Sequence, residues 1–273
     1  MSDIPIKSRE VQAMKLATVG KGGSGKTTIA GTLTRIFAER GNNILAIDGD
    51  PNPNLAHTLG LSRSEVQKIT YIPPSIMKQG ERVDDVVQMV PTIPREEIIS
   101  EYGVRAAPHV DLLVMGQPAH GSAGSGCMCA SHRAVRGLVA ELTAFGEHTV
   151  TDMEAGLEHL KRGTARHVDM MLIVAEPYYR SLEAAMRTAE LSRELEIPHI
   201  KLVANKVRNS NDEEAIRTFC DQHLIDVIGI VPLDENLIEA ERLEQAPYDF
   251  MSNSPGVQAI RKIAAEIDNL GVE

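Results

Sequence analysis

The feature that most constrains the fold is a glycine-rich segment, GKGGSGKTT, at residues 20–28. The apolar run KLATVG precedes it, and IAGTLTRIFAERG, with helical spacing, follows it. Gly20, Gly25, Lys26 and Thr27 fit the pattern G-x-x-x-x-G-K-[ST], in which backbone N–H groups cradle a polyphosphate at the start of a helix. A glycine-rich turn with a fortuitous lysine is the alternative. Because a strand and a helix flank the motif, it predicts a nucleotide-binding α/β domain.

The same pattern gives each polar residue of the loop a role. Lys26 is expected to meet the β- and γ-phosphates, and the Thr27 hydroxyl is expected to ligate Mg²⁺. The residues expected to surround the nucleotide are Gly22, Gly23, Ser24, Gly25, Lys26, Thr27 and Thr28.

Beyond the loop, short apolar runs alternate with helical patterns up to the C-terminus. Runs such as VDMMLIVAEP and HIKLVANKV are nearly continuous, as in strands covered on both faces. The alternation predicts an α/β fold with one doubly wound, mostly parallel sheet and helices on both faces. We expect a single domain over residues 1–273, with residues 62–108, rich in proline and charge, as a variable insertion.

Composition narrows the class of protein. The formal net charge of −10 argues against a nucleic-acid binder, which needs a basic face. No signal peptide or membrane-spanning run is apparent, which predicts no membrane partner. Three cysteines do not make a disulfide framework. We therefore expect a cytoplasmic protein.

A second lysine within the loop, Lys21, points to a particular group. The segment GKGGSGKT resembles the deviant phosphate-loop ATPases, which include septum-positioning and plasmid-partition ATPases and the nitrogenase iron protein. The resemblance implies an ATP-dependent homodimer in which Lys21 reaches the nucleotide of the partner. A cation delivered in this way offsets charge on the transferred phosphoryl group. The alternative is a solvated lysine beside the ligand.

Three aspartates at strand ends complete this resemblance. Asp50, in DGDPNPNL, matches the acid that positions or activates the attacking water. Asp152, in VTDMEAGLEHL, matches the acid that holds Mg²⁺, usually through water. Asp48 is either part of this chemistry or a residue that caps a turn, and a turn-capping role is also open for Asp152.

Base selection is predicted from ANKVRN. Asn205 and Lys206 lie where such folds place the purine, and a guanine reader needs an acid three residues after the asparagine. Arg208 stands there instead, so adenine is favoured. The family places a proline-bearing loop against the adenine after the next strand, which would be Pro232.

Two cysteines lie one residue apart in GSGCMCASH. In an extended segment the thiols of Cys127 and Cys129 point to the same side, and a two-fold dimer would supply four. Four thiolates suit Zn²⁺ or Ni²⁺, and His132 is a possible further ligand. Burial against the sheet is the alternative for this pair. For Cys220, within AIRTFCDQHL, we expect a place in the core.

The phosphate loop with Lys21 and Lys26, DGDPN, GCMC, DMEAGLEHL and NKV together resemble the CooC-type nickel-insertion ATPases of carbon monoxide dehydrogenase and acetyl-CoA synthase maturation. The resemblance covers residues 15 to about 240, and the mid-chain CxC pair is its specific element. It implies a homodimeric metallochaperone with ATP or ADP, Mg²⁺ and Ni²⁺ (or Zn²⁺), and a nickel-enzyme acceptor such as carbon monoxide dehydrogenase. Positioning or partition ATPases and iron–sulfur electron-transfer ATPases remain as alternatives.

Overall fold

A computed structural model describes residues 14–50, 53–83, 86–115, 142, 148–153 and 168–270. Cys127, Cys129 and His132 lie outside these ranges, as does the EAGLEHL segment at residues 154–160.

The described part of the chain is built on an eight-stranded sheet with the order β10–β9–β8–β1–β7–β2–β6–β5. All neighbouring strands run parallel except β5, which is antiparallel to β6. The mostly parallel sheet confirms the predicted fold class. The strands are β1 (Lys15–Gly20), β2 (Ile44–Asp48), β5 (Val104–Ala107), β6 (Val110–Val114), β7 (His148–Asp152), β8 (Met170–Ala175), β9 (His199–Val207) and β10 (Asp226–Pro232).

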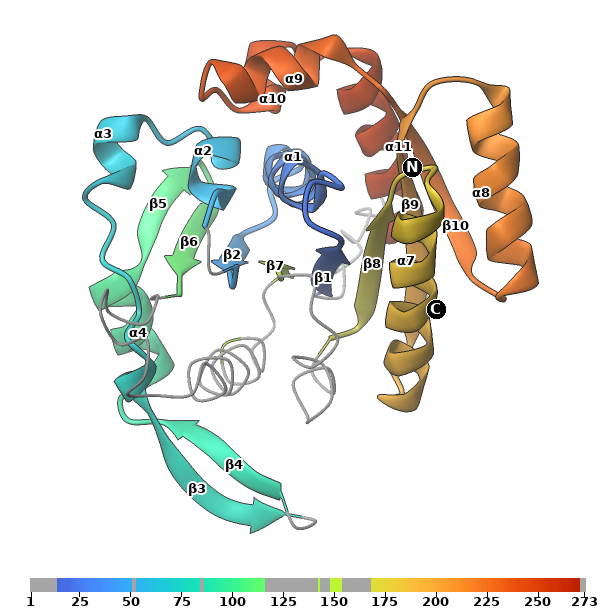
Figure 1. The fold of residues 1–273 in the computed structure, drawn as a ribbon. Coiled ribbons are helices and arrows are strands. Elements are labelled where there is room, and N and C mark those ends of the chain that lie inside the picture. The colour runs from blue at the N-terminus through green and yellow to red at the C-terminus, as the bar shows by residue number, and fades with distance from the viewer. Residues whose placement is uncertain are drawn as a thin grey trace, which may run out of the picture.

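Helices cover both faces of this sheet (Figure 1). One face packs on α1 (Lys26–Glu39), α2 (Leu55–Leu59) and α11 (Pro255–Leu270). The other packs on α4 (Arg95–Tyr102), α7 (Tyr179–Glu194) and α8 (Ser210–Gln222). The shorter helices are α3 (Arg63–Val66), η1 (Pro74–Ile76), α9 (Glu235–Arg242) and α10 (Pro247–Phe250).

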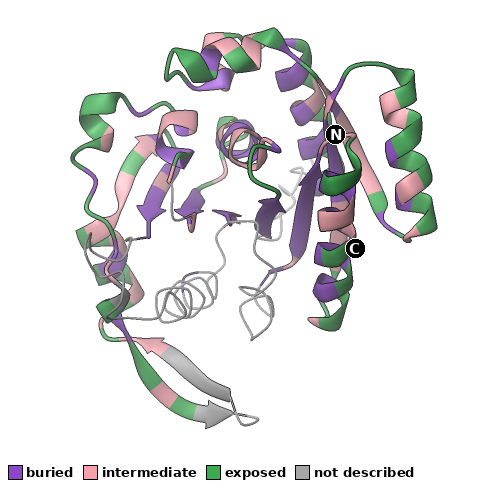
Figure 2. Ribbon diagram, in the orientation of Figure 1, coloured by how far each residue is buried: buried purple, intermediate pink, exposed green. Residues whose placement is uncertain are grey.

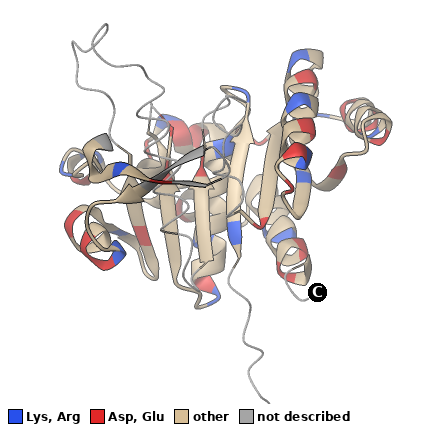
Figure 3. Cartoon of the chain, turned by 90° about the horizontal axis from the view of Figure 1, so that it is seen from below, with Lys and Arg blue, Asp and Glu red and all other residues tan. Residues whose placement is uncertain are grey.

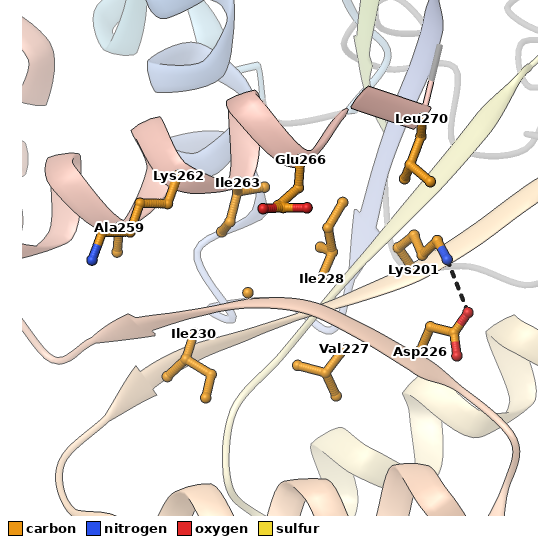
Figure 4. Close-up of a pocket in the computed structure, with 11 residues that line it drawn as sticks. Lys201, Asp226, Val227, Ile228, Ile230, Ala259, Lys262, Ile263, Glu266 and Leu270 are labelled. Atoms are coloured by element: carbon orange, nitrogen blue, oxygen red, sulfur yellow. Dashed lines mark hydrogen bonds and ion pairs between the residues drawn. The ribbon is translucent and has the colours of Figure 1, made fainter. Parts of the chain in front are cut away.

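Two-sided cover explains the continuous apolar runs of the sequence. Every residue of β8, MMLIVA, is buried, and alternate side chains enter the two opposite cores. Figure 2 shows the central strands as buried along their length and the helices as exposed on their outer sides. Charged residues lie mainly on the helices and loops around the sheet (Figure 3).

Residues 62–108 hold more structure than the sequence suggested. They form α3, η1, a hairpin of β3 (Met77–Val83) and β4 (Val86–Pro91), α4 and β5. The hairpin projects from the body of the molecule, whereas β5 extends the main sheet (Figure 1). The single-domain assignment and the variability of this segment stay predictions.

Within the described residues, no helix is both long and apolar enough to cross a bilayer. The longest helices in the described ranges, α7 and α11, have 16 residues each.

The chain order of the strands locates the functional edge. After β1 the chain runs through helix α1 to β2, and β7 lies between β1 and β2 in the sheet. The strand β8 lies on the other side of β1. In sheets of this kind, ligands bind beyond the carboxyl ends of the strands, where the order reverses. The glycine-rich loop follows β1 at that point, and Asp48 and Asp152 end the strands β2 and β7 beside it.

Candidate functional site

The loop after β1 has a backbone that only glycine allows at key positions. Gly25, the residue before α1, has a φ of 92°, and a Cβ there would overlap the Asn205 side-chain amide. At Gly20 a Cβ would lie 2.5 Å from the carbonyl oxygen of Val174 on β8. The loop is therefore shaped by close approach to β8 and β9, and it leads into the N-terminus of α1.

Lys26, the first residue of α1, lies among carboxylates. Its Nζ is 2.7 Å from Oδ2 of Asp50, and both side chains are nearly buried, at 12% and 13% exposure. Burial alone would lower the pKa of Lys26, but the charges of Asp152, Asp50 and Asp48 outweigh it and raise that pKa. Lys26 is therefore held as a cation beside the residue predicted to activate water.

The Asp152 carboxylate is held by two threonine hydroxyls from different elements. Thr27, on α1, donates to Oδ2 at 2.5 Å, and Thr18, on β1, donates to Oδ1 at 3.1 Å. Burial raises the pKa of Asp152 to about 6, against the opposing effects of Lys26, Thr27 and Thr18. Thr27 and Asp152, the two predicted Mg²⁺ residues, are therefore in direct contact.

Asp48 lies directly across from Asp152 in the register of β2 and β7, and its side chain is fully buried. It accepts hydrogen bonds from the backbone N–H of Asp50 at 3.2 Å and of Leu55 at 2.9 Å. Burial, with the nearby Asp152 carboxylate adding to it, raises the pKa of Asp48 to about 7. By accepting from these two N–H groups, Asp48 has the turn-capping role that the sequence left open for it. Its carboxylate also belongs to the charged cluster around Lys26.

The two residues predicted to face the purine contact the phosphate loop itself. The Asn205 amide donates to the carbonyl oxygen of Ser24 at 2.7 Å, and Lys206 Nζ donates to that of Gly23 at 2.5 Å. Lys206 has a φ of 57° and also forms an ion pair with Glu176 at 3.1 Å. Both residues therefore brace the loop from β9, in addition to any contact with a base.

The remaining predicted nucleotide residues lie around the same edge. Pro232, at the end of β10, pairs with Val207 beside Lys206. Lys21, Gly22 and Gly23 are exposed, and Thr28 is half-buried on the first turn of α1. The exposure of Lys21 leaves its side chain accessible to a second molecule.

The residues present fit a magnesium-bound nucleoside polyphosphate. The Oγ of Ser24 is fully buried inside the loop and has no hydrogen-bond partner among the described residues. The loop ends at a helix N-terminus with a lysine, which suits phosphate. Thr27 and Asp152 supply the oxygen donors that Mg²⁺ prefers.

Two polar residues of the site were missed at the sequence level. Glu176 directly follows β8 and forms an ion pair with Lys206. An acid directly after an apolar run was the signal in the sequence that could have found it. Thr18 is the one polar residue in the buried stretch from Leu16 to Val19. A polar residue within such an apolar run was the signal that could have found it.

The predicted cysteine site, Cys127 and Cys129 with His132, lies outside the described residues and stays a prediction. Across the described ranges, no group of three His, Cys, Asp or Glu side chains is arranged to hold a metal ion. Cys220 is fully buried, and burial raises the pKa of its thiol to about 11, which agrees with the expected core position.

With this geometry in place, comparisons with known proteins define the class. Residues 15–247 match the family described as the CobQ/CobB/MinD/ParA nucleotide binding domain. The chain belongs to this family and is a P-loop ATPase.

Two curated relatives lie close in sequence. The carbon monoxide dehydrogenase accessory protein CooC of Rhodospirillum rubrum is 36% identical over 247 residues, which span 87% of this chain and 90% of that protein. An uncharacterized ATP-binding protein of Methanocaldococcus jannaschii is also 36% identical, over 84% of this chain and 89% of its own length.

Solved structures share the fold at lower identity. The septum site-determining protein MinD of Pyrococcus horikoshii, complexed with Mg-ADP, matches with a TM-score of 0.65 at 20% identity, over 95% of this chain and 98% of that one. A putative plasmid partition protein of Borrelia burgdorferi, bound to AMPPNP, also has a TM-score of 0.65, at 14% identity, over 93% and 98% of the two chains.

Proposed function

We propose that this ATPase is a homodimeric metallochaperone that uses ATP hydrolysis to deliver nickel, its cargo, to a carbon monoxide dehydrogenase or acetyl-CoA synthase-type enzyme. The observation that carries the proposal is the 36% identity to CooC over nearly the full length of both proteins. The CxC pair at Cys127 and Cys129 adds soft ligands of the kind that such cargo requires.

The ATPase half of the proposal rests on Lys26, Asp50, Thr27 and Asp152. Lys26 Nζ lies 2.7 Å from Asp50 Oδ2, so the lysine expected to meet the phosphates is next to the acid expected to orient the attacking water. We propose that Asp50, beside this lysine, orients the water that attacks the bound phosphate. Thr27 and Asp152 would hold Mg²⁺, which neutralises charge on the phosphates.

The dimer half rests on the exposed Lys21 and the CxC pair. A lysine on the open side of the loop can reach a nucleotide held by a second copy, which couples hydrolysis to association. An isologous interface brings each residue near its own copy, so two CxC pairs near the axis give four thiolates. We propose that closure assembles this thiolate site and that hydrolysis opens it and releases the cargo.

One alternative, a membrane-positioning ATPase, needs a free amphipathic terminal helix. The apolar side of α11 packs instead into the core through Val257, Ile260, Ile263 and Ile267. The apolar face of α11 is therefore not free to bind a membrane surface.

Metal content decides between nickel delivery and an iron–sulfur role. Anaerobically prepared protein should be offered Ni²⁺ in competition with Zn²⁺, with and without ADP, and analysed by plasma mass spectrometry together with its size in solution. We expect about half a nickel per protomer in a dimer, because two copies share one site.

The matched variants are Cys127→Ser with Cys129→Ser, and Cys220→Ser alone. The first should lose the nickel and keep ATP hydrolysis, whereas the second should keep both, because Cys220 is buried in the core. Nickel retained by the double variant, or about four irons per dimer, would overturn the nickel proposal and leave the ATPase class intact.

A further inference from the structure

The site contains a buried hydroxyl with no assigned role, that of Thr18 on β1. Thr18 is fully buried, and its strand neighbours Ala17 and Val19 are apolar. A hydroxyl in such a place costs free energy unless it makes a hydrogen bond. The hydrogen bonds of the Thr18 hydroxyl therefore indicate its role.

Those contacts converge on the end of β7. Thr18 pairs with Asp152 in the register of β1 and β7, and its Oγ1 lies 3.1 Å from Asp152 Oδ1. The carbonyl oxygen of Thr151 is a second, longer acceptor at 3.3 Å. The Thr18 carbonyl oxygen also accepts a 3.0 Å hydrogen bond from the N–H of Met153. Thr18 thus contacts the residues on both sides of Asp152 and its carboxylate.

The two oxygens of Asp152 have different partners. Oδ2 faces the Thr27 hydroxyl at the start of α1, whereas Oδ1 faces Thr18 within the sheet. If Thr27 ligated a cation through a lone pair of its oxygen, its O–H could still donate to Oδ2. Thr18 holds the other oxygen, Oδ1, from within the sheet, so the two hydroxyls together fix the direction of the carboxylate.

We propose that Thr18 is a positioning residue for the magnesium site: its hydroxyl orients Asp152 so that this carboxylate and Thr27 act on one cation. The proposal rests on the role proposed above for Asp152 and Thr27 and is independent of nickel. Partners that orient a metal-binding side chain commonly contribute a factor of 10 to 100 to metal affinity.

The test measures how Mg²⁺ tightens ADP binding, by calorimetric titration of ADP at a series of Mg²⁺ concentrations. Thr18→Val keeps the shape of the side chain and removes the hydroxyl. We expect the half-effective Mg²⁺ concentration to rise about tenfold, with little change in the ADP affinity without Mg²⁺. Thr18→Ser, which restores the hydroxyl, should return the value to within about threefold of the wild type.

Thr149 gives a matched control on the neighbouring strand β7. It is also almost fully buried, but its hydroxyl has no hydrogen-bond partner among the described residues. Thr149→Val should leave the Mg²⁺ response unchanged. An equal rise in Thr149→Val, a wild-type response in Thr18→Val, or no recovery in Thr18→Ser would each overturn the proposal.

Asp152→Asn separates this inference from the assignment beneath it. If that variant also responds to Mg²⁺ like the wild type, the magnesium site itself is misassigned. If Asp152→Asn loses the response and Thr18→Val keeps it, only the role of Thr18 is wrong.

Discussion

The two ends of helix α1 carry ionic contacts of opposite character. At its start, Lys26 lies nearly buried beside Asp50 and close to two further buried carboxylates. In its second half, Arg35 pairs with Asp249, and Arg40, the residue that follows the helix, pairs with Asp268, both on or near the surface. Both ends of α1 form ion pairs with other elements, but of the two only the N-terminal end brings several charges together in a nearly buried site.

This difference in burial indicates that the ion pairs at the start of α1 serve the functional site, whereas those near its end attach the helix to its neighbours. Buried like charges oppose folding, because desolvation is costly and repulsion is strong in a low-dielectric interior. The cluster of Asp48, Asp50 and Asp152 therefore contributes little to stability, and its charges fit a site for phosphate and a cation. Exposed ion pairs contribute about 0–1 kcal/mol each, so the second half of α1 gains a modest attachment to the C-terminal helices.

The largest expected effect compares one cation from each end. Lys26→Met should lower ATP hydrolysis by about 10²- to 10³-fold or more, because a preorganised positive charge on the phosphates is lost. Arg35→Met, on the same helix, should leave the rate within about twofold of the wild type. Phosphate release under saturating ATP measures both. Comparable losses in the two variants would show that α1 acts as a single unit and would break the comparison.

The next effect concerns the stability cost of the buried acids. Asp48 titrates near 3.8 in the unfolded chain and near 7 in the folded one. Between these values the folded state binds more protons, so the unfolding free energy of the wild type should fall as pH rises from about 4 to 8. Asp48→Asn lacks this group and should lose less stability over the same range.

The difference between the pKa values of Asp48 in the folded and unfolded chain sets an upper limit on this change in unfolding free energy. It corresponds to at most about 4 kcal/mol, and the loss of one acceptor for the Asp50 or Leu55 N–H offsets about 1 kcal/mol of it. Urea unfolding at pH 4 and pH 8, without Mg²⁺ or nucleotide, gives the difference. A variant whose stability follows pH in parallel with the wild type would show that Asp48 is not the group responsible.

Much of this architecture could be predicted from the sequence, for physical reasons. A glycine pattern placed between a strand and a helix has few uses, and continuous apolar runs require cover on both faces. The loop, β1 to β2 and the parallel sheet follow from these local signals. Asp48 and Asp152 were found because they end apolar runs.

Other contacts depend on which strands become neighbours. The sequence separates Thr18 from Asp152 by more than a hundred residues, and only the insertion of β7 between β1 and β2 brings them together. The brace from Asn205 and Lys206 to the loop likewise follows from the place of β9. The β3–β4 hairpin was missed because residues 62–108 lack a clear periodicity.

A smaller effect is expected at the attached end of α1. Arg35 binds both carboxylate oxygens of Asp249, at 2.6 and 2.8 Å, and also donates to the Leu59 carbonyl. Asp249→Asn should lower the unfolding free energy by about 1 kcal/mol, less in high salt, because the pair is half-exposed. The control Glu183→Gln, which breaks a single intrahelical pair with Arg187, should cost about 0.3–0.5 kcal/mol.

Denaturant unfolding at low and high NaCl measures this pair of variants. A loss of several kcal/mol in Asp249→Asn, insensitive to salt, would mean that this end of α1 also behaves as a buried ionic site. The contrast between the two ends would then be one of function alone.

The loss of one hydroxyl, in Tyr248→Phe, is the smaller half of a last test of how this end of α1 is held. Two guanidinium groups lie over the Tyr248 ring, with Arg35 at 4.9 Å and Arg261 at 5.2 Å from its centre, and the Tyr248 hydroxyl contacts Glu39. Tyr248→Phe keeps the ring and should cost about 0.5 kcal/mol for the lost hydrogen bond. Tyr248→Leu also removes the cation–π contacts and should cost about 1 kcal/mol more. Thermal unfolding with matched salt resolves the two; equal losses would assign the attachment to the hydroxyl and not to the aromatic face.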